Sequence, residues 1–586
     1  MSNLPGMGAI VADGGCGFRV WAPHADSVSV AGDFNEWNNQ VHSMEHEGNG
    51  YWYGWVDGAK AGDEYQFFLR NGDMELWRID PYAMQVTNSI GNGVIVDHAS
   101  FDWEGDTFTT PNHNNLVIYE MHVGSFAGEN GTLDQVAERL DHISQLGVNC
   151  IQLMPLMEFA GDKSWGYNPA HIFAIESSYG GPDALKAMIK QAHRRGISVI
   201  VDVVYNHLGP SDLDLWQFDG WSENDKGGIY FYNDWKSATP WGDTRPDYGR
   251  PEVRQFLRDN ANMWFDHYHV QGLRYDMTPF MRSVNGGERD IPEGWAMCRE
   301  INSEIRAKRP DAILIAEDLH GVHAVTDTGP DDAHFHSQWD THFVHPVRGA
   351  LTEMRDENRS VEAVVKAITY NYGDAYERVI YTESHDEVAN GKARIPTEVN
   401  PGDPQGWFGQ KRSTLGAGLV LTSPGIPMLF QGQEFLQGEW FRDDVPLDWH
   451  LNEEYHGIVR LYRDLVRLRL NNEGRSKGLM GQDMQVIQAN NSSKVIAFHR
   501  WMNGGAGDDV VVALNLSTNT WGQYRIGFPA AGRWELLLNS DSKIYSDDFG
   551  DQYASDVEAN GPAQDGMPAS AEIALGPYSV VVYGRA

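Results

Sequence analysis

Residues 379–394 read VIYTESHDEVANGKAR, and they join a β-strand pattern directly to a cluster of ionisable side chains. The run begins with residues of high strand propensity, and His385, Asp386 and Glu387 follow at once. Adjacent charged groups at a strand end contribute little to stability, but they are typical of a catalytic floor. We therefore expect His385 and Asp386 to have partners at the ends of other strands.

The chain from Leu116 onward alternates between strand and helix patterns. Eight apolar segments are predicted strands, and the sixth of them is the weakest. Eight alternating units over a few hundred residues predict a (β/α)8 TIM barrel, an α/β fold with its active site at the carboxyl ends of the strands. The eight segments are VIYEMHV (117–123), NCIQLMP (149–155), SVIVDVVY (198–205), GLRYDM (272–277), AILIAED (312–318), SQWDTHF (337–343), VIYTESHD (379–386) and IPMLFQG (426–432).

Two segments between these strands have the helical period. In residues 131–147, leucine, valine and isoleucine recur at spacings of three and four, and Gly147 supplies the stop. Residues 181–196 repeat the pattern, with Pro182 near the start and Gly196 as the C-cap. A doubly wound open sheet is the alternative fold, but no glycine-rich phosphate loop follows any strand, which favours the barrel.

Short alternating strands flank the barrel on both sides. Residues 1–110 predict a small β-sandwich, and residues 481–586 predict a second all-β domain that closes on a strand pair. The catalytic barrel would then occupy residues 111–480. A chain of 586 residues is too long for one core, so three domains are a reasonable division.

The net charge of −37 excludes nucleic acid and anionic membrane as expected partners, because phosphate binding needs a basic surface. Three widely spaced cysteines, Cys16, Cys150 and Cys298, cannot form a disulfide framework or a zinc site. The sequence shows no secretory signal and no apolar run long enough to span a membrane. We therefore expect a cytoplasmic protein, and its 20 Trp and 24 Tyr suit stacking on sugar rings.

Polar residues gather where four of the predicted strands end. Because the carboxyl ends of barrel strands meet at one mouth, these residues are candidates for catalysis. Strands three and four lie too far apart for one unit of roughly 30 residues, so an insertion at about 208–248 should follow strand three. The candidates are Asp202, Asn206 and His207 after strand three, Arg274 and Asp276 at strand four, Glu317 and Asp318 at strand five, and His385 and Asp386 at strand seven.

Three carboxylates at one barrel mouth suggest a retaining glycosidase mechanism. One carboxylate attacks the anomeric carbon and a protonated one serves the departing oxygen, with the two about 5 Å apart. Crowding by other carboxylates would keep the acid protonated. Arg274, two residues before Asp276 on the same strand face, would hold that carboxylate ionised. Each residue also has a structural interpretation: Asp202 as a hydrogen-bond acceptor, His207 as a loop histidine and Asp318 as a helix N-cap.

The motifs DVVYNH (202–207), GLRYDMTPF (272–280), LIAED (314–318) and ESHDE (383–387), in this order, resemble the four sequence regions of the alpha-amylase family of glycoside hydrolases. The resemblance covers essentially the whole chain, since FRVWAP, GDFNEW and YQFFL within residues 17–95 are similar to the β-sandwich carbohydrate-binding module of branching and debranching members. It implies catalytic roles for Asp276 as nucleophile, Glu317 as acid/base and Asp386 as transition-state stabiliser. It also implies substrate binding by Tyr167, Trp165, Asp202, His207, Arg274 and His385.

The subfamily remains open between two groups. HDEVANGK (385–392), LFQGQEF (429–435) and the long segment at 445–468 resemble 1,4-alpha-glucan branching enzymes, whereas YEMHVGSF (119–126) and WGYNPAHIFA (165–174) lean towards maltooligosyltrehalose trehalohydrolases. The second region also departs from the family, with Tyr275 and the pair Met277–Thr278 where smaller residues are usual. Such bulk should reshape the site next to the scissile bond.

The resemblance implies an enzyme that cleaves α-1,4 glucosidic bonds and transfers the chain to a 6-hydroxyl. The alternative is a hydrolase of the same family, an α-amylase or trehalohydrolase, and a non-catalytic glycan-binding protein is the third interpretation. The expected partner is an α-glucan or maltooligosaccharide. No organic cofactor or metal is expected, although calcium could bind the lobe after strand three or NSDSKIYSDDFGD (539–551). The sequence leaves the oligomeric state open.

Overall fold

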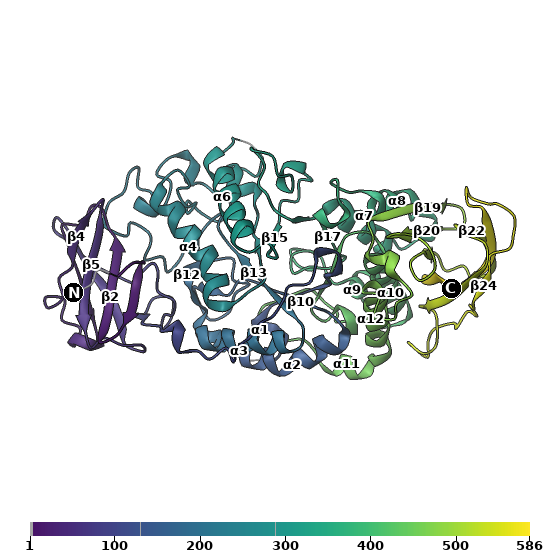
Figure 1. The fold of residues 1–586 in the computed structure, drawn as a ribbon, viewed down its shortest axis with the longest axis horizontal. Coiled ribbons are helices and arrows are strands. Elements are labelled where there is room, and N and C mark those ends of the chain that lie inside the picture. Colours follow the sequence, from purple (N-terminus) through teal and green to yellow (C-terminus); the bar gives the residue numbers. More distant parts are fainter. Residues whose placement is uncertain (1–3, 129–130, 288) are drawn as a thin grey trace.

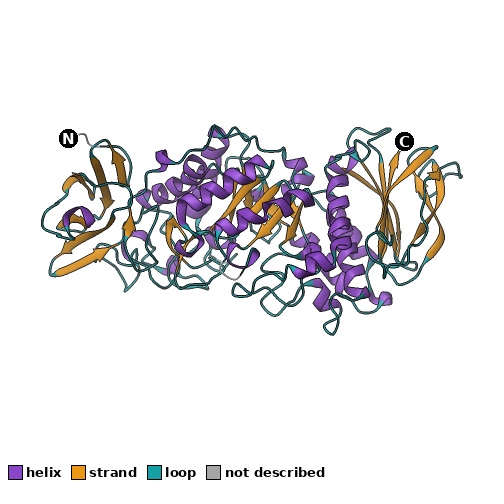
Figure 2. Ribbon diagram, turned by 90° about the horizontal axis from the view of Figure 1, so that it is seen from below, coloured by secondary structure: helices purple, strands orange, loops and turns teal. Residues whose placement is uncertain are grey.

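The computed structural model describes residues 4–128, 131–287 and 289–586. The molecule is elongated, with an N-terminal β module at one end, a helix-covered barrel in the middle and a C-terminal β domain at the other end (Figure 1). Turned by 90°, the same molecule shows the central strands surrounded by helices and the terminal strands outside them (Figure 2). No helix in the described part of the chain is long and apolar enough to cross a membrane.

The middle section is the predicted eight-stranded barrel. All eight strands are parallel and hydrogen-bonded in a closed ring, with β9 and β18 completing the closure. The weakest predicted strand forms only a three-residue strand before Asp340 begins the next helix as its N-cap. In ring order the strands are β9 (Ile118–Met121), β10 (Cys150–Leu153), β13 (Ser198–Val203), β14 (Gly272–Tyr275), β15 (Ile313–Ala316), β16 (Ser337–Trp339), β17 (Arg378–Ile380) and β18 (Ile426–Phe430).

The helices that were read from the sequence form as expected. In α2 (Leu133–Leu146) the residues at spacings of three and four are buried, and Gly147 ends the helix in a left-handed conformation with φ 91°. In α3 (Gly181–Arg194) the C-cap is Arg195, and Gly196 follows it with φ 74°. The predicted C-cap was therefore one residue late, although the glycine adopts the positive φ that its role requires.

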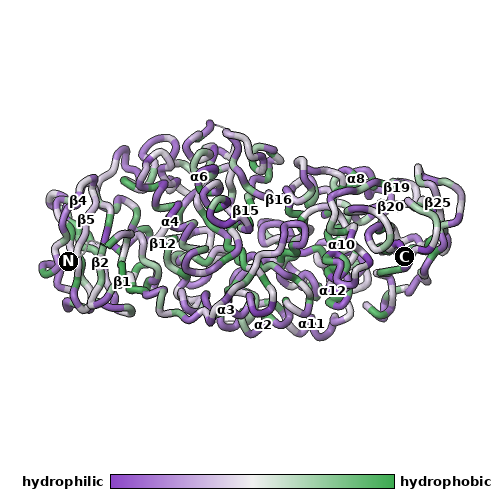
Figure 3. The backbone as a smooth tube through the Cα atoms, in the orientation of Figure 1, coloured by the Kyte–Doolittle hydropathy of each residue, from purple (hydrophilic) through white to green (hydrophobic). Residues whose placement is uncertain are grey.

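The remaining helices cover the barrel and connect it to the C-terminal domain. In α10 almost every side chain is buried, and its hydrophobic segment lies with that of α12 between the barrel and the C-terminal domain (Figure 3). Besides α2 and α3, the α-helices are α1 (Val123–Phe126), α4 (Pro251–Tyr268), α5 (Pro279–Arg282), α6 (Pro292–Lys308), α7 (Thr341–Thr352), α8 (Val361–Thr369), α9 (Ile395–Val399), α10 (Trp407–Thr422), α11 (His450–Glu454) and α12 (His456–Arg469).

Two excursions leave the barrel at its carboxyl end. After β10 the chain forms an antiparallel hairpin of β11 (Met157–Phe159) and β12 (Pro169–Ile175), which the sequence analysis did not separate from the loops. After β13 a lobe with little regular structure precedes α4 and contains only the short 3-10 helices Gly228–Tyr230 and Trp235–Ser237. These excursions bring aromatic side chains to the mouth of the barrel.

The N-terminal module contains two antiparallel sheets and packs against the lobe after β13. Arg78 donates hydrogen bonds to the carbonyls of Phe218 and Gln217, and Asn71 donates to the carbonyl of Asp219. These contacts fix the module to the side of the barrel mouth. Its strands are β1 (Gly8–Ala12), β2 (Gly15–Trp21), β5 (Tyr51–Asp57) and β4 (Glu45–Gly48) in one sheet, and β3 (Ser27–Gly32), β6 (Glu64–Asn71), β7 (Met74–Arg78) and β8 (Gly93–Val94) in the other.

The C-terminal domain also contains two antiparallel sheets. The last two strands, which the sequence suggested as a pair, lie in different sheets: β26 pairs with β21 and β23, whereas β25 pairs with β22. The six-stranded sheet contains β19 (Asp483–Asn490), β20 (Val495–Trp501), β21 (Val510–Asn515), β26 (Ser579–Arg585), β23 (Arg533–Asn539) and β24 (Val557–Glu558), and the second sheet contains β22 (Trp521–Phe528) and β25 (Ala569–Leu575).

A buried ion pair joins this domain to the barrel. Lys411 on α10 places its Nζ 2.7 Å from Oδ1 of Asp541, and both side chains are fully buried. Asp541 also accepts hydrogen bonds from the backbone N–H groups of Gly550 and Gln552. The acidic segment at 539–551, considered for calcium above, thus directs Asp541 towards a lysine.

We expect Lys411→Met to destabilise the protein by about 3–5 kcal/mol, because it leaves the Asp541 carboxylate buried without its counter-charge. Urea unfolding followed by circular dichroism measures the change. Lys543→Met, at an exposed position of the same segment, is the matched control and should change the free energy of unfolding little. Equal stability of the two variants would contradict a structural role for the Lys411–Asp541 pair.

Candidate active site

A buried arginine lies at the centre of the barrel mouth. Arg274 on β14 has no solvent-exposed surface, and its guanidinium contacts carboxylates in or directly after three neighbouring strands. Nη1 lies 2.6 Å from Oδ2 of Asp202 and 3.2 Å from Oδ1 of Asp276, and Nη2 lies 2.7 Å from Oε2 of Glu317. Burial lowers the pKa of Arg274, but the surrounding carboxylates outweigh that effect and hold its pKa well above the ordinary value.

The register of the barrel explains why these groups meet. Asp202 on β13 is paired directly with Arg274 on β14 in the parallel ladder. Asp276 follows two residues after Arg274, so both side chains project to the same side of the chain. Glu317 comes directly after β15, the next strand of the ring. Side chains at the same level of adjacent parallel strands must therefore share one space.

Glu317 is the carboxyl group that is arranged to keep a proton. Burial raises its pKa to about 8, and Asp276 adds to the increase while Arg274 opposes it. The backbone N–H of Met277 donates to Oε2 of Glu317 over 2.9 Å, which fixes the orientation of the carboxyl group. At neutral pH the group is therefore a proton donor at the mouth of the barrel.

Asp276 lies in a more polar setting. Nδ2 of Asn206 donates to Oδ2 of Asp276 over 2.7 Å, and the same amide also donates to the Asp276 carbonyl. Together with Nη1 of Arg274, these contacts leave the carboxylate with charged and neutral donors on separate oxygens. The arrangement suits an ionised carboxylate, because donors stabilise the charged form.

Tyr167 and His207 complete this side of the site. The Tyr167 hydroxyl donates to Oδ2 of Asp202 over 2.7 Å. The imidazole of His207 lies between the side-chain oxygen of Asn206, at 2.5 Å, and the Tyr167 carbonyl, at 2.8 Å. Trp241, from the lobe after β13, stacks on the His207 ring with centroids 4.3 Å apart. Burial lowers the pKa of His207.

His385 is held by a glutamate that the sequence analysis did not select. Nδ1 of His385 lies 2.7 Å from Oε1 of Glu120, and the His385 backbone N–H donates to the other carboxylate oxygen. Burial lowers the pKa of His385, but the charge of Glu120 and its hydrogen bond outweigh burial and raise the pKa overall. The available signal was a lone acidic residue inside the apolar strand VIYEMHV.

Aromatic rings surround His385. The Tyr167 ring stacks on it with centroids 5.1 Å apart, and the Trp165 ring meets it edge-on at 5.6 Å. The Trp339 ring packs against the guanidinium of Arg274, with 4.3 Å between Cζ of Arg274 and the ring centroid. Trp339 is buried, whereas Tyr167 and Trp165 are partly exposed and offer ring surfaces that suit the apolar face of a sugar.

Asp386 differs from the other predicted carboxylates. Its side chain is exposed, and its Oδ1 accepts a hydrogen bond from Asn390 over 2.7 Å. The charge of Asp386 contributes to the raised pKa of the neighbouring His385. The structure therefore brings together Tyr167, Trp165, Asp202, His207, Arg274, Asp276, Glu317 and His385, and it leaves Asp386 at the solvent-facing edge of this group.

The three residues next to Asp276 that depart from the family pattern lie in different surroundings. Tyr275 is fully buried and packs against Tyr205 and Phe335, away from the mouth. Met277 is partly exposed and has a positive φ of 37°. The Thr278 hydroxyl contacts both Glu317, through its carbonyl, and the Asp318 carboxylate. Only Met277 of this set is therefore available to shape the space beside Asp276 and Glu317.

Asp318 is not a helix N-cap. Its carboxylate forms a two-point ion pair with Arg282, with N···O distances of 3.0 and 2.9 Å. This pair ties the loop after β15 to α5, directly behind Glu317. Among the described residues, no group of three or more His, Cys, Asp or Glu side chains is arranged to hold a metal ion.

We expect the Glu317 carboxyl group to stay protonated until the pH rises through about 8. An infrared spectrum should contain a carboxylic acid C=O band that disappears in this range. Other buried carboxyl groups also have a raised pKa, such as Asp80 with a pKa of about 7. The Glu317 band is therefore assigned by subtracting the spectrum of Glu317→Gln. Loss of the subtracted band between pH 4 and 5 would mean that Glu317 titrates like a solvent-exposed carboxyl group.

Three family models match the chain in succession. Carbohydrate-binding module 48 (isoamylase N-terminal domain) matches residues 6–83, the alpha amylase catalytic domain matches residues 82–493, and the alpha amylase C-terminal all-beta domain matches residues 486–586. Solved structures agree in fold. Pullulanase type I from Bacillus subtilis in complex with maltose has a TM-score of 0.78 at 21% identity, covering 100% of this chain and 86% of that one. A pullulanase from Anoxybacillus in complex with maltotetraose has a TM-score of 0.76 at 22% identity, covering 99% and 87%.

Curated relatives match nearly the whole chain. The 1,4-alpha-glucan branching enzyme GlgB of Corynebacterium jeikeium is 30% identical over 97% of this chain and 82% of the relative. The protein of the same name from Aliivibrio fischeri is 32% identical over 98% and 83%. The resemblance seen in the sequence motifs is confirmed, and this chain belongs to the alpha-amylase family.

Proposed function

We propose that this protein is a 1,4-alpha-glucan branching enzyme, which cleaves an α-1,4 glucosidic bond and transfers the released chain to a 6-hydroxyl of a glucan. The observation that carries the proposal is the pair formed by Asp276 and a proton-holding Glu317 on one buried guanidinium. The printed names of the relatives, which match almost end to end, support branching as the outcome of the reaction.

In the first step, Glu317 protonates the glycosidic oxygen while a carboxylate oxygen of Asp276 attacks the anomeric carbon. The C–O bond to the leaving chain breaks as the glucosyl ester to Asp276 forms. This division of labour needs one ionised and one neutral carboxyl group, and the environments of the two residues favour that assignment. Arg274 would keep Asp276 ionised and would orient its carboxylate towards the anomeric carbon.

In the second step, the ionised Glu317 removes the proton of an incoming hydroxyl, whose oxygen displaces Asp276 from the anomeric carbon. A glucan 6-hydroxyl gives an α-1,6 branch, and water gives hydrolysis. Both outcomes use the same catalytic groups, so the acceptor side of the mouth decides between them. Met277 and Trp241 border that mouth, and we assign them to acceptor selection.

The other mouth residues would bind the sugar under attack. His385, charged through Glu120, offers its second ring nitrogen as a donor, and Tyr167 and Trp165 provide ring surfaces. We assign Asp202 and His207 to the same sugar, with Asp202 also orienting Arg274. Asp386, at the exposed edge, would reach the substrate hydroxyls as the transition-state stabiliser, because a bound chain would exclude solvent there.

We propose a division into an N-terminal module at 1–110, a catalytic barrel at 111–480 with its lobe at about 208–248, and a C-terminal domain at 481–586. The sheets and the barrel lie within these ranges, which supports the division. We also propose a cytoplasmic location. All three cysteines are buried free thiols, as in proteins of a reducing compartment.

The purified protein should convert amylose into a product with new α-1,6 anomeric proton signals in NMR spectra and few new reducing ends. Branching forms one bond for each bond that it breaks, so reducing ends stay nearly constant. Asp276→Asn and Glu317→Gln should each lower the rate by roughly 10²-fold or more, since each removes a group that acts in the transition state. A rise in reducing ends without α-1,6 signals would make the protein a hydrolase instead.

Glu120→Gln should lower the rate at pH 7 by roughly 10- to 100-fold, the equivalent of about 1.5–3 kcal/mol for one hydrogen bond to a charged group. Without the Glu120 charge, burial lowers the pKa of His385, and the neutral ring can no longer donate from both nitrogens. The activity that remains should therefore fall as the pH rises through the acidic range, below the ordinary histidine pKa of 6.5, and should already be low at pH 7.

The matched control is Glu362→Gln on the exposed face of α8, where the side chain forms only a surface pair with Lys366. This variant should keep the wild-type rate and pH profile. If Glu120→Gln lowered activity without moving the pH profile, Glu120 would act on folding or on substrate position and not on the charge of His385.

A further inference from the structure

A large cavity lies at the opposite end of the barrel from the mouth that contains Arg274. It has a volume of about 820 Å³. His113 lies before β9, His336 before β16 and Tyr376 before β17, so these residues mark the amino ends of the strands. The C-terminal domain closes the other side through the segment that contains Gln482. The cavity is therefore separate from the site that contains Arg274.

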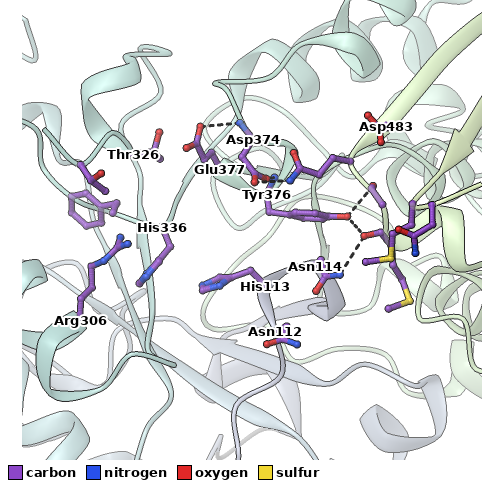
Figure 4. Close-up of a pocket in the computed structure, with 17 residues that line it drawn as sticks. Asn112, His113, Asn114, Arg306, Thr326, His336, Asp374, Tyr376, Glu377 and Asp483 are labelled. Carbon is purple, nitrogen blue, oxygen red and sulfur yellow. Dashed lines mark hydrogen bonds between the residues drawn. The ribbon is translucent and has the colours of Figure 1, made fainter.

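The lining is rich in neutral polar groups and ring surfaces. The rings of His113 and His336 stack with centroids 4.7 Å apart, and Tyr376 lies beside them (Figure 4). Burial lowers the pKa of both histidines, for His336 to about 2, so both rings are uncharged. Asn112 and Asn503 add amide groups that can donate and accept hydrogen bonds.

The charges in the cavity exclude anionic ligands. Of the described residues that line it, Arg306 is the only one with a positive charge, against the three carboxylates of Asp374, Glu377 and Asp483. A phosphate or nucleotide would meet net repulsion there. A neutral polyol would not, because its hydroxyl groups can donate to the carboxylates and amides while its CH faces pack on the rings.

The cavity walls are fixed to one another before any ligand binds. The Tyr376 hydroxyl donates to the carbonyls of Met480 and Gly481, and Nδ2 of Asn114 donates to the Met480 carbonyl. Nε2 of Gln482 donates to the Asp374 carboxylate over 2.8 Å. These bonds join the barrel to the C-terminal domain, so a ligand need not order the cavity walls.

We infer that this cavity is a second binding site for a segment of neutral α-glucan, an inference that rests on the proposed function for its choice of sugar. The few glucose units held in the cavity could not also occupy the mouth that contains Arg274, because the two sites are at opposite ends of the barrel. The cavity would instead hold a polymeric substrate on the enzyme and raise its local concentration at the mouth.

Thr328→Arg tests the inference, because Thr328 is exposed, lines the cavity and can accept a bulky charged side chain without disturbing the core. The test uses the Asp276→Asn protein, which should consume its ligand only slowly. Calorimetric titration should show that adding Thr328→Arg to this protein lowers the number of maltoheptaose molecules bound per chain by one. With active enzyme, Thr328→Arg should raise KM for amylopectin severalfold and leave the rate on maltoheptaose unchanged.

Thr520→Arg, at an exposed position of the C-terminal domain away from the cavity lining, is the matched control and should change neither result. Asp483→Lys, at the exposed rim of the cavity, gives an independent second variant. If both cavity variants bound as much maltoheptaose as the control, the inference would be overturned. The titration measures binding and does not depend on which product the enzyme makes. A product without α-1,6 bonds would contradict the proposed branching activity, but the cavity inference would still be decided by the titration.

Discussion

The burial of one positive charge governs the catalytic half of this protein. Arg274 has no access to solvent, and a guanidinium in that position needs counter-charges at hydrogen-bonding distance. Asp202 and Asp276 supply them from two adjacent strands, and the protonated Glu317 adds a carboxyl oxygen as acceptor from a third. The same contacts define the distance between the carboxyl groups, so the electrostatic requirement of the fold and the geometry of the reaction have one cause.

Unequal surroundings separate the two carboxyl groups that we propose as nucleophile and acid/base. Asp276 receives donors from both Arg274 and Asn206, whereas Glu317 shares Arg274 and has a single backbone donor. Burial then raises the pKa of Glu317 to about 8. One group is stabilised with its charge and the other with its proton, which is the asymmetry that acid-assisted displacement requires.

The rest of the molecule is held to the barrel at both of its ends. The lobe after β13 places Trp241 over the mouth, and the N-terminal module is anchored to that lobe by Arg78 and Asn71. At the far end of the barrel, the C-terminal domain is held by the buried Lys411–Asp541 pair and helps to form the cavity lined by His113 and Tyr376. The domains on either side of the barrel are thus attached by specific polar contacts as well as by packing.

Local periodicity in the sequence determined the eight barrel strands, the buried faces of the helices at 133–146 and 181–194, and the strand-end positions of Arg274, Asp276 and Glu317. These features repeat at fixed short spacings, so they can be read along the chain. Barrel closure decided the contacts between distant residues. It brings Glu120 to His385, joins Arg274 to carboxylates on both neighbouring strands, leaves Asp386 exposed and collects His113, Tyr376 and Gln482 around one cavity. No local pattern encodes such pairs, because their distances depend on strand order, register and the packing of separate domains.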